Sequence, residues 1–349
     1  MYYSAGLPLG PCEKDCRSYC QQMLDYKRDA NYSVSCPTWQ LLLNLMAHNS
    51  VSDPLKFTGE AMDEDEFIEE NTKRKNVGAL QTFWINKCQL AYYLGDWKGA
   101  EKLLVMFGKT KSTLATHIFA VIYTFFSGMN YLALARATKK TKRYQRAALP
   151  FIKLIRSWVQ GGNINLSHKL MLLNAEYEAL NERQGDKLRK LYDLAIATAS
   201  RGGFMQDAAL ANERAGLCFL DLNDDYWAEN YIDRAYSLFS EWGAEAKVRC
   251  LQESHPTILN DRQSNFLTVD TGTGSKSSDG SSVMKTAKRS SLMLSGGRAS
   301  TSFRGVPRLD PTLAQRHASV TNRSHAFSTG SLMDGGSGSV DSFNTDAFT

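Results

Sequence analysis

Apolar residues recur at steps of three and four along most of the chain up to about Pro256, and polar breaks group them into paired stripes. The clearest pair occupies residues 80–92 and 100–107, with Gly95 and Asp96 between them. Steps of three and four place side chains on one face of an α-helix, and a Gly-Asp break is typical of a turn between two helices. The pattern therefore predicts a helical hairpin in this region.

This paired pattern returns twice further along the chain, with breaks near Gly185 and Asp224. The two breaks are 39 residues apart, and two intervals of about 45 residues fit between Gly95 and Gly185. One hairpin exposes an apolar face that only a neighbouring hairpin can cover, so several copies must stack to be stable. The sequence thus predicts an all-α fold, a tetratricopeptide-like solenoid of helical hairpins over 1–256.

The copy around Asp224 is the best match to a tetratricopeptide unit, because small residues stand where its two helices are expected to touch. Gly216 and Ala228 would let the helices approach closely, and larger residues would fill the space to the next unit. The positions to which we assign repeat packing are Gly95, Ala100, Gly216, Phe219, Ala228, Ile232 and Ala235. Because a spacing of about 40 residues exceeds the usual length of about 34, helix lengths or loops must absorb the difference.

Composition changes after the predicted repeats. The preceding part is rich in Leu, Ala, Tyr, Trp and Lys, whereas residues 261–349 are rich in Ser, Gly and Thr and contain no Glu and no Trp. A segment of this composition cannot bury enough apolar surface to offset the entropy of an ordered chain. We therefore predict a second region, a disordered tail over 257–349.

Several hydroxyl groups in the predicted tail follow a basic residue by two or three positions, as basophilic kinases prefer. The candidate phosphorylation sites are Ser290, Ser291, Ser300, Thr301 and Ser319. Each phosphate would add about −1.5 to −2 charges, so two or three would cancel the net charge of +5. A basic, Ser-rich tail also yields such matches by chance, and both interpretations stay open.

Composition and charge restrict the class of protein. The chain is 43% hydrophobic and 22% charged, a globular balance, and its Lys+Arg excess of 41 over 36 Asp+Glu is spread thinly. Without dense basic blocks, a dedicated nucleic-acid binder is disfavoured. The seven cysteines are an odd number, and the first ten residues contain no basic or apolar signal segment. These features favour a reduced, cytoplasmic protein.

Cys12, Cys16 and Cys20 are the strongest candidates for metal or redox chemistry. Their spacing of four residues would place the three thiols on one face of a helix, where a soft metal or an oxidant could reach them. No fourth ligand lies nearby, and the spacing matches no familiar zinc pattern. We therefore favour packing of small side chains along a helix seam and predict neither metal nor cofactor.

Residues 112–135 contain no charge and include the most apolar run of the chain, at 118–126. A candidate membrane span at 114–135 must therefore be considered. The polar residues His117 and Asn130 lie within it, and it falls in the register of the helical repeats. Burial as a core helix is the interpretation that we favour.

Two further polar groups have both a functional and a structural interpretation. The acidic run at 63–70, followed by basic residues at 73–75, could hold a cation but lacks the glycine and alternation of a calcium loop. The first turns of an exposed helix explain it better. His168, Lys169 and Glu176 could act as acid–base partners, although capping or a polar contact between helices is the role that we favour.

The sequence offers no support for catalysis. It contains no G-x-x-x-x-G-K-[ST] loop, and GTGSKS at 272–277 imitates only the end of one. Glycine-rich, H-R-D and D-F-G motifs of protein kinases are missing as well. No histidine stands in a recognisable motif with a nucleophile and an acid. We therefore predict that the chain is not an enzyme.

Short motifs point to a relationship with a known family. The most specific are LYDLAI at 191–196, AALANE at 208–213 and WGAEAKV at 242–248. They resemble the helical region of a family of very large signalling ATPases, whose chains also carry protein-kinase-like, ATPase and often sensor histidine-kinase domains. The resemblance covers about 7–256 and leaves out every catalytic domain of that family.

This resemblance implies tetratricopeptide-like helices and a place in a signalling assembly. The function that we predict is a scaffold that binds a partner protein through the helical-repeat surface. The alternative is a truncated regulatory region of a multidomain ATPase or kinase whose catalytic domains are encoded next to it. An in-frame phosphate-binding loop upstream of Met1 would favour that alternative.

Overall fold

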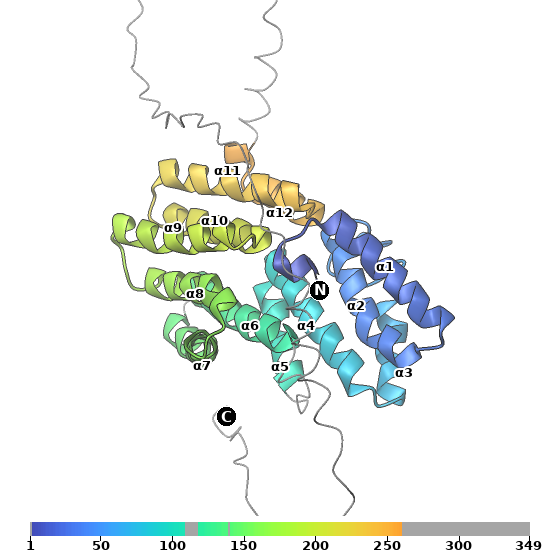
Figure 1. Ribbon diagram of the computed structural model, residues 1–349. Coiled ribbons are helices and arrows are strands. Elements are labelled where there is room, and N and C mark those ends of the chain that lie inside the picture. The colour runs from blue at the N-terminus through green and yellow to red at the C-terminus, as the bar shows by residue number, and fades with distance from the viewer. Residues whose placement is uncertain (1, 109–117, 139, 260–349) are drawn as a thin grey trace, which may run out of the picture. The chain divides into compact units, whose positions relative to one another are not determined.

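The computed structural model describes residues 2–108, 118–138 and 140–259, and every regular element in these ranges is a helix (Figure 1). Two short 3₁₀ helices, η1 (Tyr2–Ala5) and η2 (Ile164–Leu166), accompany the α-helices. The α-helices are α1 (Leu9–Asp25), α2 (Asp29–Leu45), α3 (Glu64–Lys73), α4 (Val77–Tyr93), α5 (Trp97–Gly108), α6 (Ile118–Ala137), α7 (Thr141–Gln160), α8 (Ser167–Ala179), α9 (Gly185–Arg201), α10 (Met205–Asp221), α11 (Asp225–Trp242) and α12 (Glu245–Ser254). Of the predicted tail, residues 257–259 are described: they are helical, and Leu259 is buried in the core. Residues 260–349, with all five candidate phosphorylation sites, lie outside the described residues.

The helices pack as consecutive hairpins, which confirms the predicted all-α class and hairpin order. In the series from α4 to α11 each odd-numbered helix packs against the even-numbered helix before it, and α4, α6, α8 and α10 pack in turn against one another. The second helices of these four hairpins begin 44, 44 and 40 residues apart. These intervals agree with the spacing that the sequence predicts.

Local sequence explains where the helices begin and end. Gly95, with φ of +83°, and Asn223, with φ of +57°, turn the chain after α4 and α10. Asp224 then caps α11, because its carboxylate accepts a hydrogen bond from the Trp227 amide. The break predicted near Gly185 lies slightly earlier than expected: the turn spans 180–184, and Gly185 already begins α9. The acidic Asp186 is favourable in the first turn of that helix.

The predicted packing positions fall mainly in the closest helix pair. A Cβ atom built on Gly216 would lie 2.6 Å from Ile232 and 3.4 Å from the carbonyl oxygen of Ala228, so α10 and α11 touch there. Phe219, Ala228, Ile232 and Ala235 are all buried, as is Ala100 on α5. Gly95, which we also assigned to repeat packing, does not lie at a close contact between helices. It forms the turn after α4, and no atom lies within 4 Å of where its Cβ would be.

Replacing Gly216 by Val is expected to lower the free energy of unfolding by about 1–3 kcal/mol, because the added side chain overpacks a close contact. Urea unfolding followed by circular dichroism measures this change. Gly10, around which a Cβ meets nothing within 4 Å, offers a matched control at the start of α1. Equal costs for Gly216→Val and Gly10→Val would contradict the close approach of α10 and α11.

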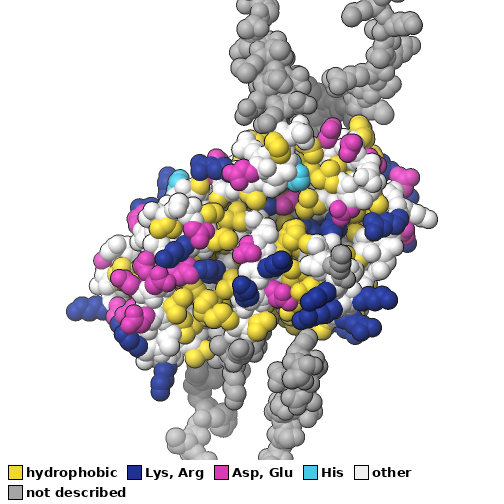
Figure 2. Space-filling view, turned by 180° about the vertical axis from the view of Figure 1, so that it is seen from behind, with side chains coloured by type: hydrophobic (Ala, Val, Ile, Leu, Met, Phe, Trp, Pro, Cys, Tyr) yellow, Lys and Arg dark blue, Asp and Glu magenta, His cyan; other side chains and the backbone are white. Residues whose placement is uncertain are grey.

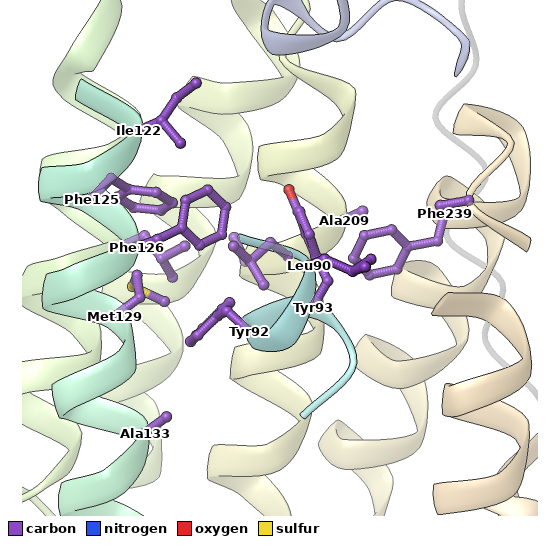
Figure 3. Packing of buried hydrophobic residues seen from close by; sticks show 14 of the residues in the cluster. Leu90, Tyr92, Tyr93, Ile122, Phe125, Phe126, Met129, Ala133, Ala209 and Phe239 are labelled. Atoms are coloured by element: carbon purple, nitrogen blue, oxygen red, sulfur yellow. The ribbon is translucent and has the colours of Figure 1, made fainter. Parts of the chain in front are cut away.

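The apolar run that raised the question of a membrane span forms α6. Within the described ranges it is the single helix that is long and apolar enough for a span, and 72% of its most apolar window is buried in the structure. Its side chains Phe125 and Phe126 pack against each other in the core, and Phe126 also packs against Tyr93, which in turn contacts Phe239 (Figure 3). This position is consistent with the core helix of a soluble protein. Residues 114–117 of the predicted candidate lie outside the described residues.

The two ends of the described helical region meet. The indole N–H of Trp242, at the end of α11, donates to the carbonyl oxygen of Leu7 at 3.1 Å. Helix α12 packs against α2, and the Cys250 thiol on α12 lies 3.7 Å from the carbonyl oxygen of Leu94. The segment before α1 therefore lies against the last hairpin, in the middle of the molecule (Figure 1).

Candidate binding pocket

A pocket of about 440 Å³ lies where the N-terminal segment meets the inner helices α4, α6, α8 and α10. Its wall is largely apolar, and Figure 3 shows two contributors, Tyr93 and Phe126, side by side, with ring centroids 5.4 Å apart. The remaining lining side chains used below are Tyr3, Ala5, Gln89, Ile122, Lys169, Phe204, Gln206 and Asp207. A largely apolar pocket of this size with a few polar groups is typical of ligand sites.

Three charged or polar side chains from two hairpins meet at one edge of the pocket. Asp207, at the start of α10, lies 2.8 Å from His168 Nε2 and 2.7 Å from Lys169 Nζ, both on α8. Burial raises the pKa of Asp207, but the charge of Lys169 and the hydrogen bond from His168 outweigh it and hold this pKa below its ordinary value. The Lys169 ammonium also lies 4.4 Å from the ring centroid of Phe125. Asp207 is therefore a fixed anion.

Replacing Asp207 by Asn is expected to lower the free energy of unfolding at pH 7 by about 2 kcal/mol, because Lys169 loses a charged hydrogen bond. A lowered carboxylate pKa stabilises the folded state above the ordinary value near 4 and loses this effect as pH falls through the folded pKa. The stability curves of the wild type and the variant should therefore converge as the pH falls below about 4. Urea titrations across this range test the prediction, and parallel curves would contradict it.

Two glutamine side chains that line the pocket each have a carbonyl oxygen without a hydrogen-bond partner among the described residues. Gln89, on α4, and Gln206, on α10, are each only 4% exposed. The Oε1 atom of each has no hydrogen-bond partner among the described residues. A buried polar atom without a partner costs free energy, and in native proteins it commonly marks a place where a ligand or water completes the bond. The hydroxyl groups of Tyr3 and Ser4, which line the same pocket, also have no partner among the described residues.

The N-terminal segment already lies in this groove, held by its main chain. Gln206 Nε2 donates to the carbonyl oxygen of Ser4 at 2.8 Å, next to the bond from Trp242 to Leu7. Gly6 allows this approach, because it has φ of +92° and a Cβ there would lie 2.3 Å from the Gly203 carbonyl oxygen. The inner side chains therefore hold a stretch of backbone through its carbonyl groups.

Glu176 belongs to a separate, buried ionic cluster between hairpins. Its carboxylate accepts from Arg214 Nη2 at 2.6 Å, from Tyr192 Oη at 2.6 Å and from Arg136 Nη2 at 3.3 Å. Burial raises the pKa of Glu176, but the two guanidinium groups outweigh it and hold the pKa below its ordinary value. This cluster joins α6, α8, α9 and α10 in the core and is structural.

The structure therefore divides the predicted group of His168, Lys169 and Glu176. The first two meet Asp207, 39 and 38 residues away, and Glu176 meets Arg214, again 38 residues away. Each is a polar contact between helices, as favoured from the sequence. Sequence reasoning missed Asp207 and Arg214, although their distance from their partners equals one repeat, which is the signal that could have found them.

The three predicted cysteines lie on α1 and line a second, smaller pocket of about 250 Å³ beside α2. No group of three or more metal-ligating side chains suited to a metal ion occurs in the described part of the chain. Burial raises the pKa of Cys16 to about 11 and that of Cys20 to about 12, and it raises the pKa of Cys12 as well. Protonated thiols are weak nucleophiles and weak metal ligands, so packing explains this row.

The acidic run begins helix α3, as favoured from the sequence. Asp63 caps the helix by accepting from the amides of Asp65 and Glu66, and Glu64 pairs with Lys87 on α4.

Seen from behind, side chains of both signs alternate with apolar patches over the surface (Figure 2). Neither sign predominates on the face in view.

Comparison of the chain with protein-family models, with curated proteins and with solved structures finds no match. The resemblance of residues 7–256 to the helical region of signalling ATPases therefore stays a prediction. The chemistry of the pocket has to be inferred from its own residues.

Proposed function

We propose that the chain is a non-catalytic scaffold of tetratricopeptide-like hairpins that binds a segment of a partner protein in the pocket beside its N-terminal segment. The observation that carries this proposal is the main-chain capture by Gln206 and Trp242. Both side chains donate to backbone carbonyls, of Ser4 and Leu7. Such contacts recognise the peptide main chain itself rather than particular side chains.

The arrangement of the inner helices supports the same proposal. Stacked hairpins present their first helices as one continuous inner surface, which is where such stacks commonly receive a ligand. Here α4, α6, α8 and α10 pack in sequence along that surface, and each contributes residues to the pocket wall. The N-terminal segment fills one part of this surface, and the pocket remains open beside it.

The chemistry of the pocket favours binding over catalysis. A general base works best with a pKa near the operating pH, whereas the Asp207 carboxylate has a lowered pKa and bonds to both His168 and Lys169. The lining residues include no cysteine. We accordingly propose a signalling role in the cytoplasm in which the partner, and not a substrate, occupies the pocket.

Selection of random displayed peptides on the immobilised full-length chain tests the function, followed by amide hydrogen exchange with the selected peptides. We expect bound peptide to slow exchange at residues 3–5, 89–93 and 204–207. The matched control is Tyr226→Ser, which removes an exposed aromatic ring on α11 outside the pocket and should leave peptide binding unchanged. Slowed exchange confined to the outer helices, or the loss of binding in the control, would contradict the proposal.

A further inference from the structure

The pocket has hydrogen-bonding groups that the described residues leave without a partner. Gln89 and Gln206 both line it, and the Oε1 atom of each has no partner among the described residues. The hydroxyls of Tyr3 and Ser4, which also line it, have none either, and a hydroxyl can donate or accept. Each carboxamide oxygen can accept, but it cannot donate. An occupant must therefore bring N–H or O–H groups to satisfy these two atoms. The Tyr3 hydroxyl at the same pocket keeps its proton, since burial raises the pKa of Tyr3 to about 12.

The pocket carries no spare charge. Lys169 and Asp207 are the only charged residues among those that line it, and they lie 2.7 Å apart and compensate one another. Moving a third charge into such a site would cost its hydration without providing a free partner. An occupant is therefore favoured when it is neutral.

The rest of the wall is apolar and aromatic. Ile122 and Phe126 come from α6, Tyr93 from α4, and Phe204 from the turn before α10. Phe126 packs edge-to-face on Tyr93 with ring centroids 5.4 Å apart, which gives the wall a fixed shape. A wall of this kind buries an apolar side chain favourably.

We infer that the pocket binds an uncharged, apolar side chain together with the backbone N–H groups that flank it. The side chain would lie against Ile122 and Phe126, and the flanking N–H groups would donate to Gln89 and Gln206. This inference rests on the proposed function and specifies the part of a partner peptide that the pocket reads.

The minimal probe is N-acetyl-phenylalaninamide, which carries one aromatic side chain, neutral N–H donors and no charge. It is titrated into the full-length chain and followed by ligand-observed NMR. Free phenylalanine, which is zwitterionic, and N-acetyl-lysinamide, which carries a charged side chain, are titrated in parallel. A probe this small binds with a Kd on the order of millimolar at best. We expect the neutral aromatic probe to bind at least about fivefold more tightly than either charged compound.

The variant Gln89→Leu separates a ligand-binding role from a structural one. It removes an acceptor that has no partner among the described residues, together with an amide that hydrogen-bonds to Tyr93. The melting temperature should therefore fall by no more than about 4 °C, while affinity for the probe falls about 5- to 10-fold. Gln22→Leu, at an exposed position of α1, is the matched control and should leave the affinity unchanged.

A second variant keeps the test valid if Gln89→Leu is unstable. Ala5 is exposed and lines the pocket, so Ala5→Trp adds a ring at the pocket without overpacking the core. It should abolish binding of the neutral probe and leave the melting temperature unchanged. Binding that survives Ala5→Trp would overturn the inference.

The remaining outcomes are distinguishable. Equal binding of the charged compounds, or unchanged affinity in Gln89→Leu with an intact fold, would overturn the inferred ligand class. If no probe binds while selected peptides still slow exchange at the pocket, the inference fails and the scaffold function stands. If selected peptides protect only other surfaces, the proposed site fails together with the inference.

Discussion

Replacing Arg214 by Ala is expected to lower the free energy of unfolding by about 3 kcal/mol or more, because it leaves Glu176 buried with only part of its compensation. Glu176 is 0% and Arg214 1% exposed, and two guanidinium nitrogens lie 3.0 and 2.6 Å from the same carboxylate oxygen. Arg136 remains near the other oxygen, at 3.3 Å, which keeps the loss toward the lower end of the usual 3–5 kcal/mol or so. Urea unfolding at pH 7 gives the difference directly.

The control for this change is another arginine pair, at the surface. Arg249 lies 3.3 Å from Glu245, with side chains that are 61% and 52% exposed, and Arg249→Ala should cost no more than about 1 kcal/mol. A cost for Arg214→Ala as small as that for Arg249→Ala would mean that Glu176 is not held as described.

Replacing Trp242 by Ala is expected to lower the free energy of unfolding by about 3–5 kcal/mol, the usual cost of emptying a large aromatic site. The ring is fully buried and packs against Tyr93 and Phe239, with centroid distances of 6.0 and 6.5 Å. Its N–H also holds the carbonyl oxygen of Leu7. The variant should therefore both destabilise the core and release the N-terminal segment.

Trp242→Phe separates these two effects. It keeps most of the apolar ring but loses the N–H donor, so it should cost less than Trp242→Ala while still releasing the segment around Leu7. Amide hydrogen exchange at residues 3–7 reports the release, and thermal unfolding reports the stability. If exchange at 3–7 stays as slow in both variants as in the wild type, the bond from Trp242 does not hold the segment.

The repeats could be predicted from the sequence because their cause is local. Apolar stripes at helical spacing, separated by Gly-Asp and Asn-Asp turns, already specify which residues one hairpin must bury against the next. The contacts between hairpins repeat with the same period, as the 38- and 39-residue partners of Glu176 and His168 illustrate. A search for polar positions one repeat apart within apolar stripes would have found these pairs.

The pocket could not be predicted in the same way. Gln206 meets Ser4 across 202 residues, and Trp242 meets Leu7 across 235. These contacts belong to no period, since they depend on how far each hairpin is rotated against the one before it. That rotation accumulates from the sizes of the many side chains packed between hairpins. Gly6 likewise resembles an ordinary turn glycine until the Gly203 carbonyl is found beside it.

The meeting of the first and last helices has a consequence for how the protein loses its structure. In an open array, each repeat touches only its neighbours, so the outermost units can fray while the middle stays folded. Here the outermost units brace each other through Trp242, Gln206 and the packing of α12 on α2. Neither terminal unit is free to melt alone, and heating should give one sharp, all-or-none transition rather than a gradual series.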